Sequence, residues 1–163
     1  MLRTCSFIAL LLAALGLTLG AAHVLELPPK MRYDAEMYAA VTSTLYPLFG
    51  SVGAVIQIGA VLAAIVLTFL VRGRSAFRLT LLGAVGLALS IVLWAALVAP
   101  VNAEWLRVIE SAPESVPEAY LRLCARWEYG HVAAFAAWLI GFALLLLSVI
   151  AETPAHRSGD SAA

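Results

Sequence analysis

Charge is scarce in this chain. Of its 163 residues, 12% are Asp, Glu, Lys or Arg, whereas soluble proteins contain about 25%. The ten basic residues balance the ten acidic ones and form no basic block, which excludes the electrostatic footprint of a nucleic-acid-binding protein. Hydrophobic residues make up 63% of the chain. This composition predicts a protein that lies in a lipid bilayer and has no separate soluble domain.

Cysteine is also rare, with two residues in the chain. Cys5 begins the first apolar run, and Cys124 lies in the last long loop, on the opposite side of the predicted membrane. We therefore expect no disulfide between them. Neither has a Cys or His partner at metal-ligand spacing, so both are expected to act as small apolar residues.

Long uncharged runs are the dominant feature. A helix needs about 20 apolar residues to cross a bilayer, and four runs meet this length: residues 5–27, 50–71, 79–99 and 129–151. We predict an all-α integral membrane four-helix bundle, with residues 1–152 as a single four-span transmembrane domain and residues 153–163 as a short disordered cytoplasmic tail. The first run also resembles a cleavable secretory signal, whose removal would leave three spans.

The distribution of arginine predicts the orientation of the spans. Arg72, Arg74 and Arg78 crowd the short loop between the second and third spans. Basic residues on the other side are spread over two longer loops and mixed with acids. Because dense basic loops favour the cytoplasmic side, we expect a protein of the bacterial inner membrane with both termini on the cytoplasmic side.

The two long outer loops are predicted to contain short interfacial helices. Pro28 and Pro29 are expected to stop the first span, after which Asp34 can cap a helix along the membrane surface. In the second loop, Asn102 can cap a helix that ends at Ser111. Most aromatic residues of these loops are expected to form a belt at headgroup level: Tyr33, Tyr38, Tyr46, Trp105, Tyr120 and Trp127.

Polar residues near the spans are few, and they gather at the outer end of all four. His23 and Glu26 lie three residues apart in the first span, and Glu128 and His131 lie three apart at the start of the fourth. This spacing places each pair on one face of its helix. The other candidates at the same depth are Gln57, Trp94, Asn102, Arg126 and Trp127.

We interpret this layer as a ligand-binding pocket, because ionisable residues inside a membrane are costly and usually mark function or packing. Phe135 and Trp138 follow His131 at helical spacing and are expected to form an aromatic floor under a small, flat, apolar ligand. For each residue alone, the alternative is a helix-end side chain that reaches the headgroups. The expected ligand-binding residues are Glu26, Gln57, Trp94, Arg126, Glu128, Phe135 and Trp138.

Three chemistries fit this layer. His-x-x-Glu and Glu-x-x-His on two helices resemble a di-metal centre, although Gln57 stands where such sites use further carboxylates. His23 and His131 could instead bind a haem iron from its two sides. In the third, a histidine acts as a general base on an acidic ligand. We favour the third, which uses no metal and no cofactor.

Several stretches carry a family resemblance: the run from His23 to Arg32, then Tyr38, Tyr46 and Pro47, then Pro100-Val-Asn, and finally Leu121 to His131, which ends Arg-Trp-Glu-Tyr-Gly-His. They resemble the small four-span membrane proteins that are grouped with the fungal anthrone oxygenases. The resemblance extends from about His23 into the fourth span. Many relatives have an arginine soon after the final histidine, whereas this chain has Ala133 and Ala134.

The resemblance implies a cofactor-free oxygenation of an anthrone-like polyphenol to a quinone. It also implies the catalytic positions, which are His23, Asn102, Trp127 and His131. The expected partners are therefore the lipid bilayer and a lipophilic aromatic or quinone-like small molecule. Two other functions stay open from the sequence: a non-catalytic membrane module that binds a lipid or a partner protein, and a metal or haem redox protein.

Overall fold

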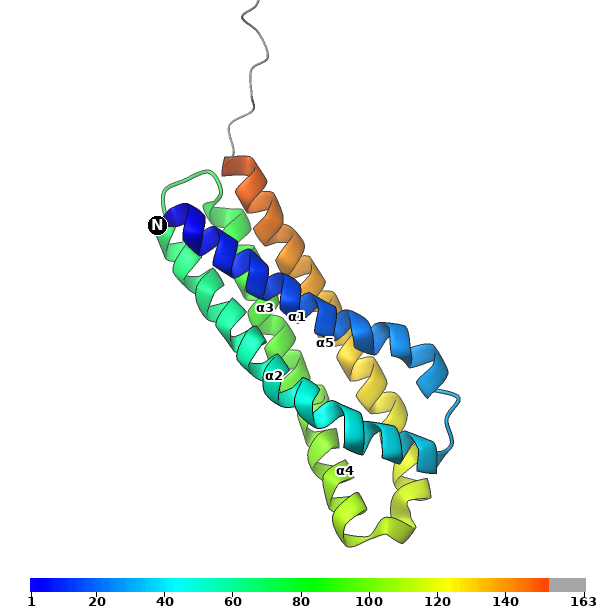
Figure 1. The fold of residues 1–163 in the computed structure, drawn as a ribbon. Helices are drawn as coiled ribbons and strands as arrows, with labels where there is room; N and C mark the ends of the chain where they lie inside the picture. Colours follow the sequence, from blue (N-terminus) through cyan, green and yellow to red (C-terminus); the bar gives the residue numbers. More distant parts are fainter. Residues whose placement is uncertain (153–163) are drawn as a thin grey trace, which may run out of the picture.

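A computed structural model describes residues 1–152, and the tail predicted to be disordered, residues 153–163, lies outside the described residues. The described part is helical, and its elements are α1 (Leu2–Lys30), α2 (Ala35–Leu70), α3 (Phe77–Leu97), α4 (Ala99–Ser111), η1 (Pro113–Ser115) and α5 (Val116–Glu152). The start of α1, the turn between α2 and α3 and the end of α5 lie at one end of the bundle (Figure 1). The opposite end, which contains the α1–α2 connection, α4 and η1, is called the distal end below.

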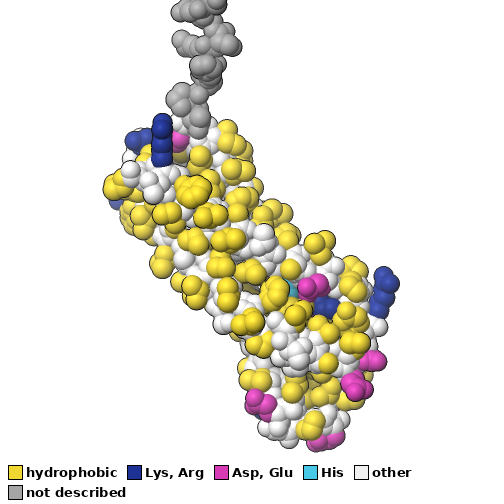
Figure 2. All heavy atoms as spheres, in the orientation of Figure 1, with side chains coloured by type: hydrophobic (Ala, Val, Ile, Leu, Met, Phe, Trp, Pro, Cys, Tyr) yellow, Lys and Arg dark blue, Asp and Glu magenta, His cyan; other side chains and the backbone are white. Residues whose placement is uncertain are grey.

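Four helical segments of the described chain are long and apolar enough to cross a membrane. They are Leu2–Lys30, Ala35–Leu70, Phe77–Ser111 and Pro113–Glu152. Between the two ends, hydrophobic side chains cover much of the face seen in Figure 2. Val55 and Phe69 of α2 are 73% and 61% exposed, a pattern suited to contact with lipid tails and not with water. The prediction of an all-helical protein with four helices long and apolar enough to span a membrane is confirmed for the described residues.

Prolines interrupt the helices less than the sequence suggests. α1 passes through Pro28 and Pro29 and ends at Lys30, three residues beyond the predicted span. α2 continues through Pro47 as one helix of 36 residues. Each proline costs its helix one backbone hydrogen bond and crowds the carbonyl four residues earlier, but the helical turns continue on both sides of it. A separate interfacial helix before the second span is therefore not seen.

The helix caps are partly as predicted. The carboxylate of Asp34 accepts a hydrogen bond from the backbone N–H of Met37 at 2.8 Å and caps α2. Asn102, expected to be a cap, lies inside α4, which already begins at Ala99 because Pro100 fits the first turn of a helix. Its side chain is thus free for a tertiary contact. α4 follows α3 after a single residue, Val98.

Small residues bring the helices together in the half of the bundle near the termini. Gly16 and Gly20 of α1 face the rings of Trp138 and Phe135 on α5, so this pair packs within the chain. The Trp138 indole also donates a hydrogen bond to the Ala13 carbonyl at 2.8 Å. Such close contacts replace the hydrophobic effect as the main source of helix association in lipid.

Gly141 of α5 packs directly against the backbone of α3. A Cβ atom at this position would lie 2.7 Å from the backbone nitrogen of Leu87 in α3, which cannot move aside. We expect Gly141→Ala to destabilise the bundle by about 1–3 kcal/mol through overpacking. Unfolding of the purified protein in a detergent titration would measure it. Gly50→Ala is the matched control, because no heavy atom lies within 4 Å of that Cβ. Equal stability of the two variants would contradict the predicted contact.

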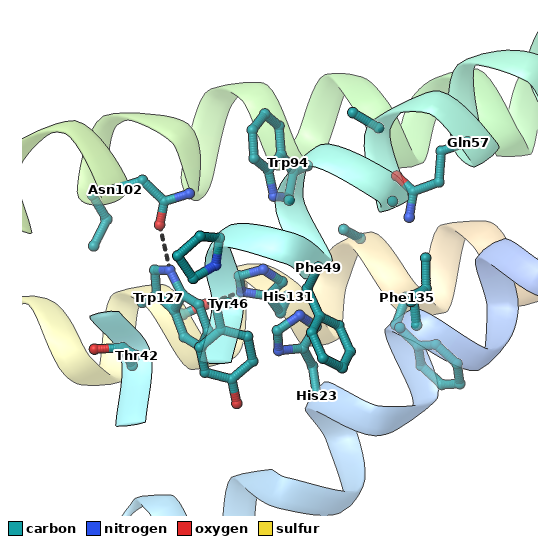
Figure 3. A pocket seen from close by; sticks show the side chains of 18 of the residues that line it. His23, Thr42, Tyr46, Phe49, Gln57, Trp94, Asn102, Trp127, His131 and Phe135 are labelled. Carbon is teal, nitrogen blue, oxygen red and sulfur yellow. Dashed lines mark hydrogen bonds between the residues drawn. The ribbon is translucent and has the colours of Figure 1, made fainter. Parts of the chain in front are cut away.

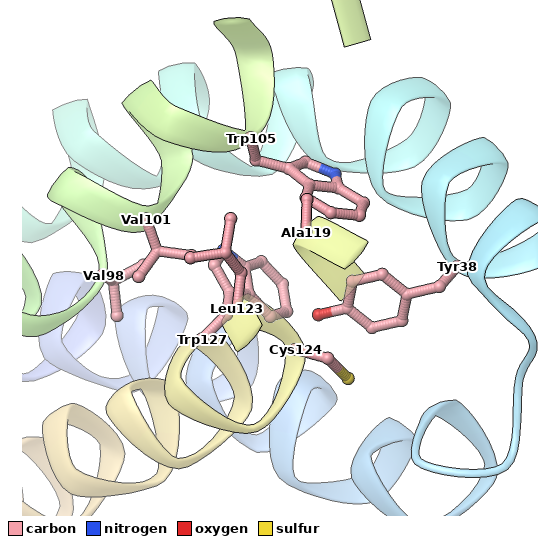
Figure 4. Packing of buried hydrophobic residues seen from close by; sticks show 8 residues of the cluster. All are labelled: Tyr38, Val98, Val101, Trp105, Ala119, Leu123, Cys124 and Trp127. Atoms are coloured by element: carbon pink, nitrogen blue, oxygen red, sulfur yellow. The ribbon is translucent and has the colours of Figure 1, made fainter. Parts of the chain in front are cut away.

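Aromatic residues of the distal end turn inward. Tyr38, Trp105 and Trp127 are buried in a cluster with Val98, Val101, Ala119, Leu123 and Cys124 (Figure 4). Tyr33, Tyr46 and Tyr120 pack against this cluster. Tyr38, Trp105 and Trp127 are thus buried between helices and do not form part of the expected belt, whereas Tyr33, Tyr46 and Tyr120 are half-buried. The predicted loops are continuous with long helices, so their aromatic side chains pack between helices.

Candidate functional site

A cavity of about 620 Å³ lies between the helices in the distal half of the bundle. All five α-helices contribute to its wall. Its volume is within the range of about 300–1,000 Å³ that is usual for small-molecule sites. Figure 3 shows that its side chains are largely aromatic, with a few polar groups among them.

Most of the predicted site residues meet at this cavity. Eight of them line it: His23, Gln57, Trp94, Asn102, Trp127, His131, Phe135 and Trp138. The structure thus brings together all four residues carried over from the family resemblance. Three other predicted residues are not part of the lining. Glu26 and Glu128 lie beside it, in a polar cluster described below, and Arg126 is exposed on α5.

The two histidines form a stacked pair. The ring centroids of His23, on α1, and His131, on α5, are 4.1 Å apart, with an angle of 30° between the ring planes. Trp127 packs against both, at 5.3 Å from His23 and 4.1 Å from His131. The ring of Tyr46 also stacks on His23, with ring centroids 5.0 Å apart. Aromatic neighbours therefore hold both imidazoles in place.

The hydrogen bond of His131 determines which ring nitrogen carries the proton. Its Nδ1 lies 3.0 Å from the backbone carbonyl oxygen of Trp127. A carbonyl oxygen can only accept, so the neutral ring is protonated at Nδ1 and keeps the lone pair of Nε2. The Nδ1 atom of His23, in contrast, is buried and has no hydrogen-bond partner among residues 1–152. Of the two histidines, His131 is thus oriented as a base.

Asn102 and Trp127 are joined directly. The Trp127 indole Nε1 donates a hydrogen bond to Asn102 Oδ1 at 2.6 Å (Figure 3). Because an indole N–H is only a donor, it determines the orientation of the amide, and the two hydrogens of Asn102 Nδ2 stay available. Asn102 lines the cavity, so this amide group can donate to a ligand there.

A buried ionic cluster adjoins the histidine pair. Lys30 is 2% exposed, and its Nζ lies 3.1 Å from Glu128 Oε1 and 3.6 Å from Glu26 Oε2. The same ammonium donates to the Tyr46 hydroxyl at 3.0 Å, and that hydroxyl donates to Glu26. Tyr38 donates to Glu128 at 3.2 Å. This cluster links α1, α2 and α5 immediately beside the cavity.

The two carboxylates of this cluster form ion pairs with Lys30 and not contacts with the histidines. Glu26 and Glu128 pair with Lys30, although each lies three residues from a histidine on its own helix. Within residues 1–152, no three His, Cys, Asp or Glu side chains are grouped so that they could hold a metal ion. The stacked rings also leave no space for a haem between His23 and His131. The geometry therefore gives the metal and haem hypotheses no support.

Several residues of this region were not predicted as part of the site. The stop predicted at Pro28 and Pro29 places Lys30 outside the first span, and the sequence indicates no ligand contact for Tyr46 or Phe49. One signal could have revealed the aromatic pair. Tyr38, Thr42, Tyr46, Phe49, Gly53 and Gln57 recur at intervals of three or four residues, which is one face of a continuous helix. All six line the cavity.

Comparison of the chain with models of known families, with curated proteins and with solved structures found no match in any of the three.

Proposed function

We propose that the protein is a membrane enzyme that oxygenates a lipophilic, planar aromatic compound without a cofactor. One observation carries this proposal: the unprotonated Nε2 of His131 belongs to a histidine pair in the wall of an apolar cavity large enough for a multi-ring ligand. A histidine in such surroundings can remove a weakly acidic proton. The family resemblance of the sequence supports the same reaction class.

For an anthrone-type compound, each residue has a definite role. His131 Nε2 takes a proton from the acidic ring carbon, and the delocalised carbanion that remains reacts with molecular oxygen to give a peroxide, which takes the proton back from His131. Loss of water then gives the quinone, so that one anthrone and one O₂ yield one anthraquinone and one H₂O. The free N–H groups of Asn102 can stabilise the negative charge on the ring oxygen. Trp127 orients Asn102, and His23 supports the His131 ring by stacking.

The proposal can be tested on protein reconstituted in lipid vesicles. We expect a hydroxylated anthrone to be converted to its anthraquinone faster than in empty vesicles, with one O₂ consumed per quinone formed. An oxygen electrode and the visible absorbance of the quinone measure the two quantities. Empty vesicles correct for autoxidation. If the anthraquinone binds but the rate equals that of empty vesicles, the protein is a binding module and not an enzyme.

The orientation in the membrane is part of the proposal. Arg72, Arg74 and Arg78 lie at the end of the bundle that holds both ends of the described chain, where Arg74 pairs with Glu152 at 2.9 Å. Dense arginine favours the cytoplasmic side of a bacterial inner membrane. α2 has 36 residues and is about 54 Å long, whereas the hydrocarbon layer is about 30 Å thick. The distal end therefore extends into the headgroup region on the outer side, with α4 near the interface.

A further inference from the structure

The wall of the cavity is exposed on one side only. None of its residues from α1 or α5 is exposed. The exposed ones belong to α2, α3 and α4: Ser43, Pro47, Gly50, Ala54, Ile58, Trp94, Asn102 and Leu106. Those on α2 recur at intervals of three or four residues and form one edge of that helix. The cavity thus opens between α2 and the α3–α4 pair.

This opening is bounded at both of its ends. Toward the termini, α2 and α3 share one buried core cluster through Ala60, Ala64 and Leu87. Toward the distal end, the indole of Trp105 on α4 donates a hydrogen bond to Thr42 on α2 at 3.0 Å. Between these contacts, Trp94 lies on the same face of α3 as buried Ser90, yet it is 37% exposed. Contacts between α2 and α3–α4 therefore close the opening at both of its ends, and Trp94 borders the opening between them.

The opening lies at the depth of the lipid tails. Gly50, Ala54 and Ile58 belong to the apolar run of α2, and Trp94 belongs to that of α3. Their neighbours on the lipid side, Val55 among them, are exposed hydrophobic residues. A molecule that enters through the opening between α2 and α3–α4 would therefore come from the hydrocarbon layer and not from water.

We propose that the ligand reaches the histidine pair sideways from the bilayer, through the opening between α2 and α3–α4. This inference rests on the proposed function and specifies its substrate class: a membrane-dissolved aromatic whose planar rings lie at His131 and whose alkyl or prenyl substituent lies in the opening. The two histidines of the cavity are at its closed side, on α1 and α5. Apart from Ser43 and Asn102, the exposed rim residues are apolar or aromatic, which suits a hydrocarbon substituent.

Gly50 provides a direct test, because no heavy atom lies within 4 Å of a Cβ built there. A larger side chain can therefore begin at this position without a clash at its Cβ atom. We expect Gly50→Phe to slow both association and dissociation of a decyl-substituted anthraquinone by about tenfold or more, with little change in Kd, since it blocks the path and not the site. Trp94→Ala should have the opposite effect on both rates.

Stopped-flow quenching of tryptophan fluorescence in vesicles measures these rates, because Trp127 and Trp138 line the cavity. Val55→Phe is the matched control: it adds the same ring to α2 at a position that does not line the cavity. Unchanged rates in Gly50→Phe, or a loss of affinity through faster dissociation alone, would overturn the access route. If vesicles fail to oxidise the anthrone while the rates respond as stated, the oxygenase proposal fails and the route stands.

Discussion

Replacing His131 by alanine is expected to lower kcat for anthrone oxidation by about 10²–10⁴-fold, the usual contribution of a general base. Its Nδ1 donates to the Trp127 carbonyl, so that Nε2 is the basic atom, whereas Nδ1 of His23 has no hydrogen-bond partner among residues 1–152. The rate of quinone formation in vesicles under saturating anthrone measures the effect. Binding of the anthraquinone product should change much less, because most of the wall is aromatic or aliphatic.

A second variant separates catalysis from packing. In His131→Asn the amide nitrogen can still donate to the Trp127 carbonyl, but the side chain is not a base. We expect this variant to unfold like the wild type and to be as inactive as His131→Ala. The control is Leu139→Ala on the same helix. The Leu139 side chain is 42% exposed, so this variant should retain activity. Substantial turnover by the asparagine variant would remove His131 from the proposed mechanism.

Replacing Lys30 by methionine is expected to destabilise the protein by about 3–5 kcal/mol, because the buried carboxylate of Glu128 would lose its counter-ion. Lys30 and Glu128 are 2% and 1% exposed, and their charged atoms are 3.1 Å apart. Glu128 Oε2 already lacks a hydrogen-bond partner among the described residues. The remaining charge would therefore have few groups to stabilise it.

A double variant distinguishes loss of a partner from loss of packing. Lys30→Met combined with Glu128→Leu removes both charges, and we expect it to recover most of the lost stability, since a buried ion pair contributes little over well-packed apolar residues. The matched control is the exposed pair of Arg122 and Glu104. Arg122→Met should cost at most about 1 kcal/mol. Detergent unfolding that gives Lys30→Met and Arg122→Met the same stability would contradict the burial of Lys30.

The sequence predicted the spans and the meeting of the histidines for simple physical reasons. Apolar runs of sufficient length define the membrane helices whatever their partners are. His23 and His131 occupy the same depth on helices that cross the bilayer in opposite directions, and the small residues Gly16 and Gly20 on the His23 face indicate which side of α1 packs inward. Their shared position thus depends on helix geometry alone.

The ionic cluster could not be predicted in the same way. Pro28 and Pro29 suggested that the helix stops before Lys30, whereas one more turn places Lys30 four residues after Glu26 and directs it inward. Which cation pairs with Glu128 also depends on the tertiary structure. Arg126 is nearby in sequence but exposed, and the partner comes from another helix. Sequence distance gives no information on that choice.

The exposed edge of the cavity wall on α2 has a consequence for mutational tolerance. Two sets of contacts hold the bundle together. One is made by glycine and alanine residues near the termini, and the other is the ionic cluster around Lys30 at the distal end. The exposed edge of α2, from Ser43 to Ile58, belongs to neither. Substitutions along this edge can therefore accumulate with small effects on folding while they change which molecules can enter the cavity. A chain of this design could acquire new ligands without first losing stability.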